Sequence, residues 1–399
     1  MIAKSQKKKD PISLLIVDDS LVFRRFLEDV FSDQEDFTIA GEAQNGIEAL
    51  ELVLRVKPDV ILLDLEMPLM DGQTTLQHLM IHRPTPTIVF SSLTSEGTAR
   101  CFDTLKNGAL DFICKDFIFQ KKELQVKKRI LMEKVRNCAE VQVRAREPVM
   151  ARTTVAKSHD ESKKRVVFCE DCGHREVFTI TSLQPLQPVI CSNCGDQIEM
   201  VLTAEAKYRR NSSLTIFGGG EGAFLNLLEI IPKLDATAVG GILAVVQQQQ
   251  QHVKEFTEYL DAISPMNVVQ ARDGVQIESG SCYVLAASEH MAIKPFSAQV
   301  TIQKFAKGSS KESIFDILLA SASTIFKENT TGIVLSGKEN LGDRGMAILL
   351  KNSGKGFVLD PNECFAKETV QHVMHENRGI SRRSTPEIIK WLQETESRI

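Results

Sequence analysis

The 399-residue sequence lacks three features that would place it in a specialised class of protein. It lacks an excess of one charge, because 48 Lys and Arg stand against 52 Asp and Glu and the formal net charge is −4, so the composition shows no preference for nucleic acid. It lacks any apolar run near the roughly 18–20 residues of a membrane span. Residues 1–10 also lack the apolar stretch of a signal peptide. We therefore expect a cytoplasmic protein without a membrane span.

The composition is that of a globular chain with more than one domain. Hydrophobic residues make up 43% and charged residues 25%, which excludes a disordered or fibrous protein. A chain of 399 residues exceeds one ordinary core, so its length predicts two or three domains. Shifts in composition predict four segments: an α/β domain at 11–125, a basic helix and linker at 126–163, a cysteine-rich segment at 164–202 and a second α/β domain at 210–395.

Four of the nine cysteines form two Cys-x₂-Cys pairs, each followed by glycine and separated by eighteen residues. They are Cys169, Cys172, Cys191 and Cys194. Two such turns can present four thiolates to one tetrahedral Zn²⁺ in a closed structural site, and the segment resembles a zinc ribbon. A redox pair and an iron–sulfur cluster are the alternatives. The other five are scattered and are expected as small core residues: Cys101, Cys114, Cys138, Cys282 and Cys364.

A basic helix is predicted between residues 121 and 146, around a narrow apolar stripe of Leu124, Leu131, Val135 and Cys138. Its basic side chains are interpreted as a solvated face, with attraction of an acidic partner as the alternative.

Apolar runs separated by helix-length segments fill residues 12–120 and predict a parallel sheet with helices on both faces. Polar residues follow four of these runs: Asp18 and Asp19, Asp64, Ser91 and Lys115. Ligands of such sheets bind beyond the carboxyl ends of the strands. Clustered carboxylates repel one another unless a cation neutralises them, and Mg²⁺ prefers such oxygen ligands. An aspartate with a lysine opposite and a hydroxyl nearby can accept a phosphoryl group.

These positions, and the loop Met67–Gly72, closely resemble the flavodoxin-like receiver domain of response regulators. The resemblance implies that Asp64 is the phospho-acceptor and that Asp18, Asp19, Asp64 and the backbone carbonyl of Glu66 hold Mg²⁺. It implies that Ser91 is the switch hydroxyl, that Lys115 binds the phosphoryl group and that Phe112 repacks. Asp116 replaces the proline that usually follows the lysine.

Residues 214–393 show a second α/β pattern, with strands expected at 214–217, 238–246, 282–286, 332–335 and 356–359. Stretches such as Leu214–Ala223 and Gly332–Gly337 resemble the catalytic domain of the chemotaxis response regulator protein-glutamate methylesterase family. The resemblance implies a doubly wound α/β domain that follows its receiver in this family's order; the ribbon between them is unusual.

The family's Ser-His-Asp triad does not carry over to this sequence. The aligned positions are Gly220, Gln248 and Leu341, none of which can act as nucleophile, base or orienting carboxylate. Three nearby residues could rebuild a triad: Ser336, His252 and Asp343. Glu221 is the alternative to Ser336. Asp343 is equally expected as a helix-capping residue and His252 as a surface residue.

Three functions follow as hypotheses. The preferred one is a chemotaxis-type two-component response regulator: a histidine kinase phosphorylates Asp64, and a methylesterase-like output domain without catalysis binds partners such as chemoreceptors. The second is an active protein-glutamate methylesterase that uses substitute residues. The third is a receiver whose ribbon and basic helix recruit another partner, such as nucleic acid. The balanced charge and the lack of a recognisable reading helix argue against nucleic-acid binding.

Overall fold

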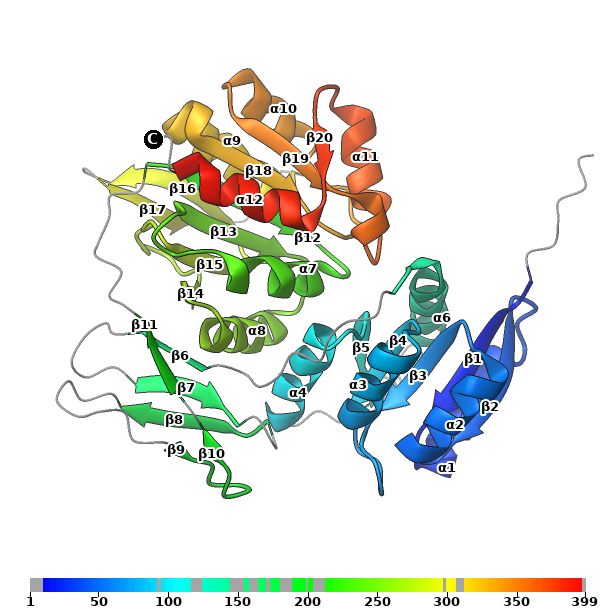
Figure 1. Ribbon diagram of the computed structural model, residues 1–399. Coiled ribbons are helices and arrows are strands. Elements are labelled where there is room, and N and C mark those ends of the chain that lie inside the picture. The colour runs from blue at the N-terminus through cyan, green and yellow to red at the C-terminus, as the bar shows by residue number, and fades with distance from the viewer. Residues whose placement is uncertain are drawn as a thin grey trace, which may run out of the picture. The chain divides into compact units, whose positions relative to one another are not determined.

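The computed structural model describes residues 10–91, 95–115, 124–143, 154–157, 164–169, 173–179, 189–198, 200–203, 212–296, 299–305 and 312–396. The chain forms two compact units, residues 1–150 and 151–399, which are described one at a time (Figure 1). Within the described ranges, no helix has the length and apolar character that a membrane crossing requires.

The first unit is built on a five-stranded parallel sheet with strand order β2-β1-β3-β4-β5. The strands are β1 (Ile12–Val17), β2 (Phe37–Ala43), β3 (Val60–Asp64), β4 (Thr87–Ser91) and β5 (Asp111–Cys114). Residues 14–17 and 60–63 are fully buried, which explains why these strands are continuous apolar runs in the sequence. This strand order is flavodoxin-like, so the predicted fold class of this unit is confirmed.

The helices of this unit begin where a polar side chain can satisfy their first backbone N–H groups. They are α1 (Leu21–Phe31), α2 (Gly46–Val56), α3 (Gly72–His82), α4 (Ser95–Lys106) and α6 (Leu124–Glu140). Ser20, Asn45 and Asp71 each cap a helix by accepting a hydrogen bond from the N–H three residues later. These caps fix the loops that leave the sheet, and two of them follow β1 and β3, where the acidic residues lie.

Helix α6 is the predicted basic helix, and it packs on the receiver sheet. Its buried apolar residues are Leu131, Val135 and Cys138, whereas Leu124 is partly exposed. Lys134 forms an ion pair with Asp111 of β5, and Arg136 Nε lies 2.7 Å from Asp36 Oδ2. Basic residues of the helix are therefore bound to the same unit, and we propose that this domain ends after α6 rather than at residue 125.

The larger part of the second unit is a seven-stranded parallel sheet, in the order β14-β15-β13-β12-β18-β19-β20. Its strands are β12 (Leu214–Gly219), β13 (Gly241–Val246), β14 (Asn267–Gln270), β15 (Ser281–Ala286), β18 (Thr330–Val334), β19 (Lys355–Leu359) and β20 (Ser381–Arg383). The hairpin of β16 (Met291–Phe296) and β17 (Gln299–Lys304) is antiparallel. All five strands expected in this region are present.

Helices lie on both faces of this sheet (Figure 1), as the doubly wound prediction requires. They are α7 (Ala223–Ile230), α8 (Gln250–Ile263), α9 (Ile314–Phe326), α10 (Asp343–Lys351), α11 (Glu368–Glu376) and α12 (Thr385–Glu396). Short 3₁₀ turns occupy Ile231–Lys233, Lys327–Asn329 and Pro361–Glu363. Strands β12, β13 and β15 are buried along their whole length, so the core of this part lies on both sides of the central strands.

The cysteine-rich segment forms two short antiparallel hairpins. One joins β7 (Lys164–Phe168) to β8 (Arg175–Thr179), and the other joins β9 (Val189–Ile190) to β10 (Gln197–Ile198). Between this segment and the receiver, the expected linker contains β6 (Thr154–Lys157), which pairs in parallel with β11 (Met200–Thr203). That pairing joins residues far apart in the chain, which is why local sequence did not predict it.

Candidate functional sites

The predicted acidic residues of the first unit meet at the carboxyl edge of its sheet. Carboxylate oxygens of Asp18, Asp19 and Asp64 all lie within 4.8 Å of one another. Asp18 and Asp64 are buried, at 1% and 2% exposure. Lys115 reaches both, with its Nζ 2.8 Å from Asp18 Oδ2 and 2.7 Å from Asp64 Oδ2. The hard oxygen donors fit Mg²⁺, and the lysine lies where it can contact an anion on Asp64.

Burial and mutual repulsion set the titration of this cluster. Burial, reinforced by the negative charge of Asp18, raises the pKa of Asp64 to about 6. Burial also raises the pKa of Asp18, against the opposing effect of Lys115. Burial alone would lower the pKa of Lys115, but its hydrogen bonds to the two aspartates outweigh this and raise it. A divalent cation would relieve the repulsion between the carboxylates.

The other predicted receiver residues lie on adjacent strands. Ser91 is the last residue of β4 and is buried, and Phe112 on β5 packs edge to face on Phe102 of α4, with ring centroids 5.7 Å apart. Glu66 follows β3, and its backbone N–H donates a hydrogen bond to Asp64. Ser91 therefore lies on β4, beside the acceptor strand β3, and Phe112 lies one strand further away, on β5.

Arg24 supports the acidic loop and was missed by the sequence analysis. This buried side chain donates from Nη1 to the carbonyl oxygens of Asp18 (2.8 Å) and Asp19 (3.1 Å), while its Nε binds Glu42 at 3.0 Å. An arginine on the otherwise apolar side of α1, with Phe23 and Leu27, was the available signal. The guanidinium thus fixes the backbone that carries two of the acidic ligands.

Three of the four predicted thiolate ligands come together between the two hairpins. The sulfur atoms of Cys169, Cys191 and Cys194 lie within 4.8 Å of one another, and those of Cys169 and Cys194 are 3.5 Å apart. Cys172 lies outside the described residues. Both turns have the same backbone bonds: Gly173 N–H donates to Cys169 O, and Gly195 N–H to Cys191 O. Both glycines have positive φ (74° and 79°), which the tight turns require.

The three aligned triad positions lie around the carboxyl edge of the larger sheet. Gly220 follows β12, Gln248 follows β13 and Leu341 is buried before α10. A Cβ atom built on Gly220 would collide with the carboxylate of Glu339. That carboxylate accepts a hydrogen bond from its neighbour's N–H, Lys338 N to Oε2 at 3.1 Å. The end of the Glu339 side chain would therefore have to move before a side chain could occupy residue 220.

The proposed substitutes do not assemble into a triad. Ser336 is fully buried, and its Oγ lies 2.6 Å from the carbonyl oxygen of Glu221 and accepts from the N–H of Ala366 at 2.9 Å. His252 lies in the first turn of α8. No contact among the described residues joins these two to Asp343. Ser336 is thus a structural bridge between loops, not an exposed nucleophile.

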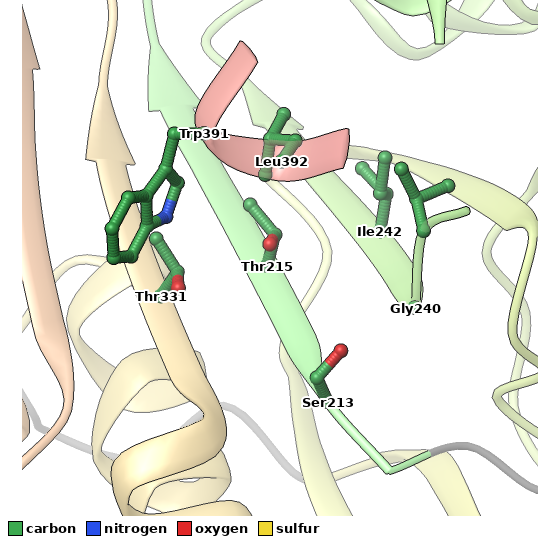
Figure 2. Close-up of a pocket in the computed structure, with 8 residues that line it drawn as sticks. Ser213, Thr215, Gly240, Ile242, Thr331, Trp391 and Leu392 are labelled. Carbon is green, nitrogen blue, oxygen red and sulfur yellow. The ribbon is translucent and has the colours of Figure 1, made fainter. Parts of the chain in front are cut away.

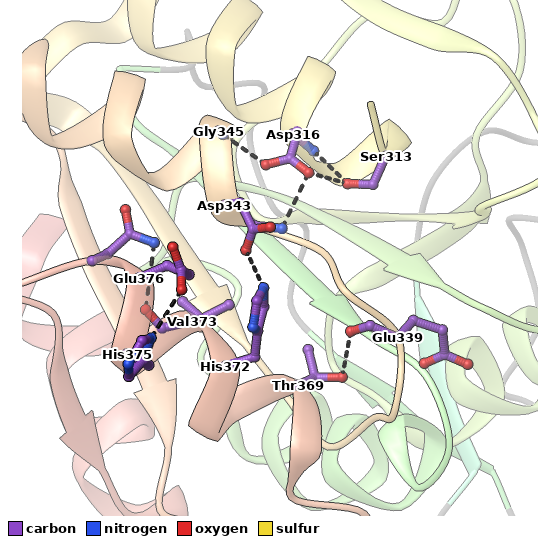
Figure 3. A network of polar contacts seen from close by, with 12 residues as sticks. Ser313, Asp316, Glu339, Asp343, Gly345, Thr369, His372, Val373, His375 and Glu376 are labelled. Atoms are coloured by element: carbon purple, nitrogen blue, oxygen red, sulfur yellow. Dashed lines mark hydrogen bonds and ion pairs between the residues drawn. The ribbon is translucent and has the colours of Figure 1, made fainter. Parts of the chain in front are cut away.

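Asp343 pairs instead with a histidine that the sequence analysis missed. Its Oδ1 lies 2.8 Å from Nε2 of His372 on α11, and the two side chains point toward each other in Figure 3. The same view shows Thr369 donating to the backbone oxygen of Glu339 at 2.8 Å, which anchors the loop that carries Glu339. The available signal for Glu339 was its place two residues before Leu341, the position that aligns with the family's aspartate.

A small hollow lies at the opposite edge of this sheet (Figure 2). It is lined by hydroxyl groups of Ser213, Thr215 and Thr331 near the amino ends of their strands, and by Trp391 of α12. Substrates of parallel sheets bind at the carboxyl edge, so this hollow belongs to the packing of α12.

Family models match two parts of the chain. A response regulator receiver domain matches residues 14–127, and a CheB methylesterase matches residues 215–389. The chain thus joins a response regulator receiver domain to a CheB methylesterase domain.

Curated relatives match nearly the whole chain. The protein-glutamate methylesterase/protein-glutamine glutaminase of Pseudoalteromonas atlantica is 28% identical over 372 residues, 92% of this chain and 94% of the relative. Protein-glutamate methylesterase/protein-glutamine glutaminase 1 of Vibrio cholerae is 26% identical, covering 94% of this chain and 96% of the relative. Among solved structures, the response regulator domain of Thermotoga maritima CheB is 39% identical (TM-score 0.31, covering 33% of this chain and 98% of that one).

Proposed function

We propose that this protein is a chemotaxis-type two-component response regulator, phosphorylated on Asp64, whose CheB methylesterase domain has lost catalysis and acts by binding proteins. A histidine kinase is the proposed phosphoryl donor, and chemoreceptors are the proposed binding partners. Two contrasting observations support this. The receiver keeps every side chain that phosphorylation requires, whereas the methylesterase domain has neither a nucleophile nor a base at the expected positions.

The receiver chemistry follows from the acidic cluster. An Asp64 carboxylate oxygen attacks the phosphorus of a phosphohistidine; a P–O bond forms, the P–N bond breaks and the imidazole leaves with a proton from solvent. Mg²⁺ held by Asp18, Asp19, Asp64 and the carbonyl of Glu66 would supply charge neutralisation there. Lys115 then contacts the phosphoryl oxygens, Ser91 turns toward them and Phe112 repacks, which changes the surface over α4 and β5.

The observation that carries the loss of catalysis is the position of Glu339. Ester hydrolysis by this family's mechanism needs a hydroxyl at residue 220 and a base at residue 248. Here a glycine and a glutamine occupy those positions, and the Glu339 carboxylate fills the space beside the glycine. A second negative charge, Glu221, lies at the same edge in an ion pair with Lys338 at 2.7 Å. Carboxylates at this position would also repel the oxyanion of an ester-hydrolysis intermediate.

An active protein-glutamate methylesterase is the second candidate, and two observations favour it. Relatives that carry this name align with more than nine-tenths of the chain. Asp343 and His372 also form a carboxylate–imidazole pair of the kind that activates a nucleophile.

Methanol release separates the two candidates. The full chain is incubated with Mg²⁺, a small-molecule phosphoryl donor and membranes carrying methylated chemoreceptors, beside a relative with an intact triad. We expect receptor-only levels of methanol, while co-sedimentation with the receptor membranes changes when Asp64 is phosphorylated. Release above the receptor-only blank would establish an active esterase, and His372→Ala would then test the pair with Asp343.

We also propose that Cys169, Cys172, Cys191 and Cys194 bind one structural Zn²⁺. The support is the convergence of three sulfur atoms on two matching turns, since closely spaced thiolates repel unless a metal or a proton neutralises them. A cytoplasmic location, where thiols stay reduced, is part of this proposal. Metal analysis of the reduced protein should find one zinc per chain, and Co²⁺ should give the visible absorption of a tetrahedral thiolate site. Absence of both signals would contradict it.

A further inference from the structure

The thiolate turns touch the methylesterase domain at one helix, α8. Phe168, the residue before Cys169, packs on Tyr259 of α8 with ring centroids 5.8 Å apart. Arg175, the residue after the same turn, pairs with Glu258 of α8, Nε to Oε2 at 2.8 Å. Both anchors therefore flank the segment that carries the thiolate ligands of the first turn.

These two contacts can transmit a change in the thiolate turns to helix α8. Phe168 and Tyr259 are buried, at 5% and 0% exposure, so their contact is a packed one. Arg175 and Glu258 are partly exposed, so their ion pair adds a smaller contribution. Beneath Phe168, a small core links the two hairpins: Val167, Cys169, Cys191 and Ile198. This core contains two of the thiolates, so loss of the metal would act directly on it.

On its other side, α8 belongs to the core of the methylesterase domain. Phe256 is fully buried and stacks on Phe224 of α7, with centroids 4.1 Å apart. The helix begins at Gln250, two residues after Gln248, the position that aligns with the family's catalytic histidine. A change in the packing of α8 would therefore affect the residues at the carboxyl edge of the large sheet.

We infer that the thiolate metal site clamps helix α8, so that zinc binding stabilises the methylesterase domain as well as the ribbon. The inference rests on the proposed zinc site. With zinc bound, the first turn holds Phe168 and Arg175 in their contacts with α8. Without it, the thiolates separate, the small core opens and α8 loses one packed face.

The chain contains a natural probe for this coupling. Its single tryptophan, Trp391, lies in α12 and packs edge to face on Phe357 of β19, with centroids 5.1 Å apart. Tryptophan fluorescence of the full chain therefore reports unfolding of the methylesterase domain alone. Hydrogen exchange of the backbone amides of α8 reports the helix directly.

The experiment compares the reduced full chain with zinc bound, after chelation and after zinc is restored. We expect chelation to lower the urea midpoint of the Trp391 signal and to speed exchange across α8 about tenfold, the size of one aromatic contact plus one exposed ion pair. Restoring zinc should reverse both changes. Exchange in α10, which packs on α9, β18 and β19, serves as the internal reference.

Two variants make the test specific. Arg175→Ala should still bind one zinc but show a smaller zinc-dependent change in α8. Arg344→Ala removes a comparable pair, Arg344 with Glu312 at 2.7 Å, and should leave the zinc-dependent change intact. One bound zinc with α8 exchange and the Trp391 midpoint unchanged by chelation would overturn the inference while leaving the zinc site standing. A chain that binds no zinc would overturn both.

Discussion

Two parallel sheets in this chain carry polar residues at their carboxyl edges, and the two edges differ in what their side chains contact. In the receiver, Asp18, Asp64 and Lys115 are buried together within ion-pair distance. In the methylesterase domain, the buried hydroxyl of Ser336 binds backbone groups and the Glu339 carboxylate fills the place beside Gly220. The comparison shows that a fold can keep its strands, loops and packing after the side chains of its family's reaction have changed.

The difference has a physical basis in what each edge stabilises. The receiver cluster brings three carboxylates together with Lys115 paired to two of them, so a bound cation would stabilise it further. The edge of the methylesterase domain is already satisfied: backbone groups, an ion pair and close contacts fill it without a ligand. The predictions below test this contrast, from the largest expected effect to the smallest.

Asp64→Asn should abolish phosphorylation, because the amide nitrogen and oxygen cannot form the acyl phosphate. Gel mobility with a phosphate-binding reagent, after incubation with Mg²⁺ and a phosphoryl donor, measures it. Asp29→Asn, an exposed carboxylate on α1, is the matched control and should remain phosphorylated. Equal phosphorylation of the Asp64 variant would place the acceptor elsewhere.

Rebuilding the triad should fail unless Glu339 is also removed. The triple variant Gly220→Ser, Gln248→His and Leu341→Asp places a Cβ atom where the Glu339 carboxylate lies, so that carboxylate must shift and its negative charge stays beside the new serine. Adding Glu339→Gly vacates that space, so only the quadruple variant should release methanol from methylated receptors. The control keeps Gly220 in an otherwise identical quadruple background. Equal activity of triple and quadruple variants would show that Glu339 does not obstruct the site.

Arg24→Ala should weaken Mg²⁺ binding roughly 10–100-fold, the usual loss when a group that orients metal ligands is removed. The reason is that Arg24 fixes the backbone of Asp18 and Asp19 without binding the metal itself. Titration calorimetry measures the affinity. The control is Arg25→Ala, which changes an exposed neighbour on α1 and should leave Mg²⁺ affinity unchanged. An unchanged affinity in the Arg24 variant would show that Arg24 contributes only to packing.

Ser336→Ala should destabilise the methylesterase domain by about 1–3 kcal/mol, because the buried carbonyl and N–H groups it contacts lose a partner. Urea unfolding followed by Trp391 fluorescence measures this, with the exposed Ser288→Ala as control. If Ser336 were instead a nucleophile, the same variant would lose esterase activity with little loss of stability.

The metal-free receiver should lose stability as pH rises. The pKa of Asp64 is raised to about 6, above its ordinary value of 3.8, so folding favours its protonated form. That contribution is fully present below about pH 3.8 and is lost as pH rises through about 6, whereas Mg²⁺ binding gains over the same interval because it needs the carboxylate. Urea midpoints of the metal-free protein between about pH 5 and pH 7 should fall less in Asp64→Asn than in the parent. Parallel pH profiles would contradict this assignment.

The elements that could be predicted from the sequence are those with a local pattern of apolar residues. Buried parallel strands are continuous apolar runs, so the parallel sheet within residues 12–120 and five of the seven strands of the second sheet could be predicted. Strands β6, β14 and β20 were missed because their identity depends on partners distant in the chain. Helix α6 was predicted as a helix, but its packing on the receiver depends on ion pairs with Asp36 and Asp111 that its own sequence does not contain.

The sequence by itself determined the two fold classes and the five receiver positions, because residues at successive strand ends of a parallel sheet must meet at one edge. Through the resemblance to the methylesterase family, it also predicted that positions 220, 248 and 341 carry no triad. Only the tertiary structure showed what occupies that edge: Glu339 against Gly220, and Asp343 with His372. It likewise decided that Phe168 and Arg175 attach the thiolate turns to α8. Such contacts join segments whose separation in the chain carries no periodic signal, so packing alone brings them together.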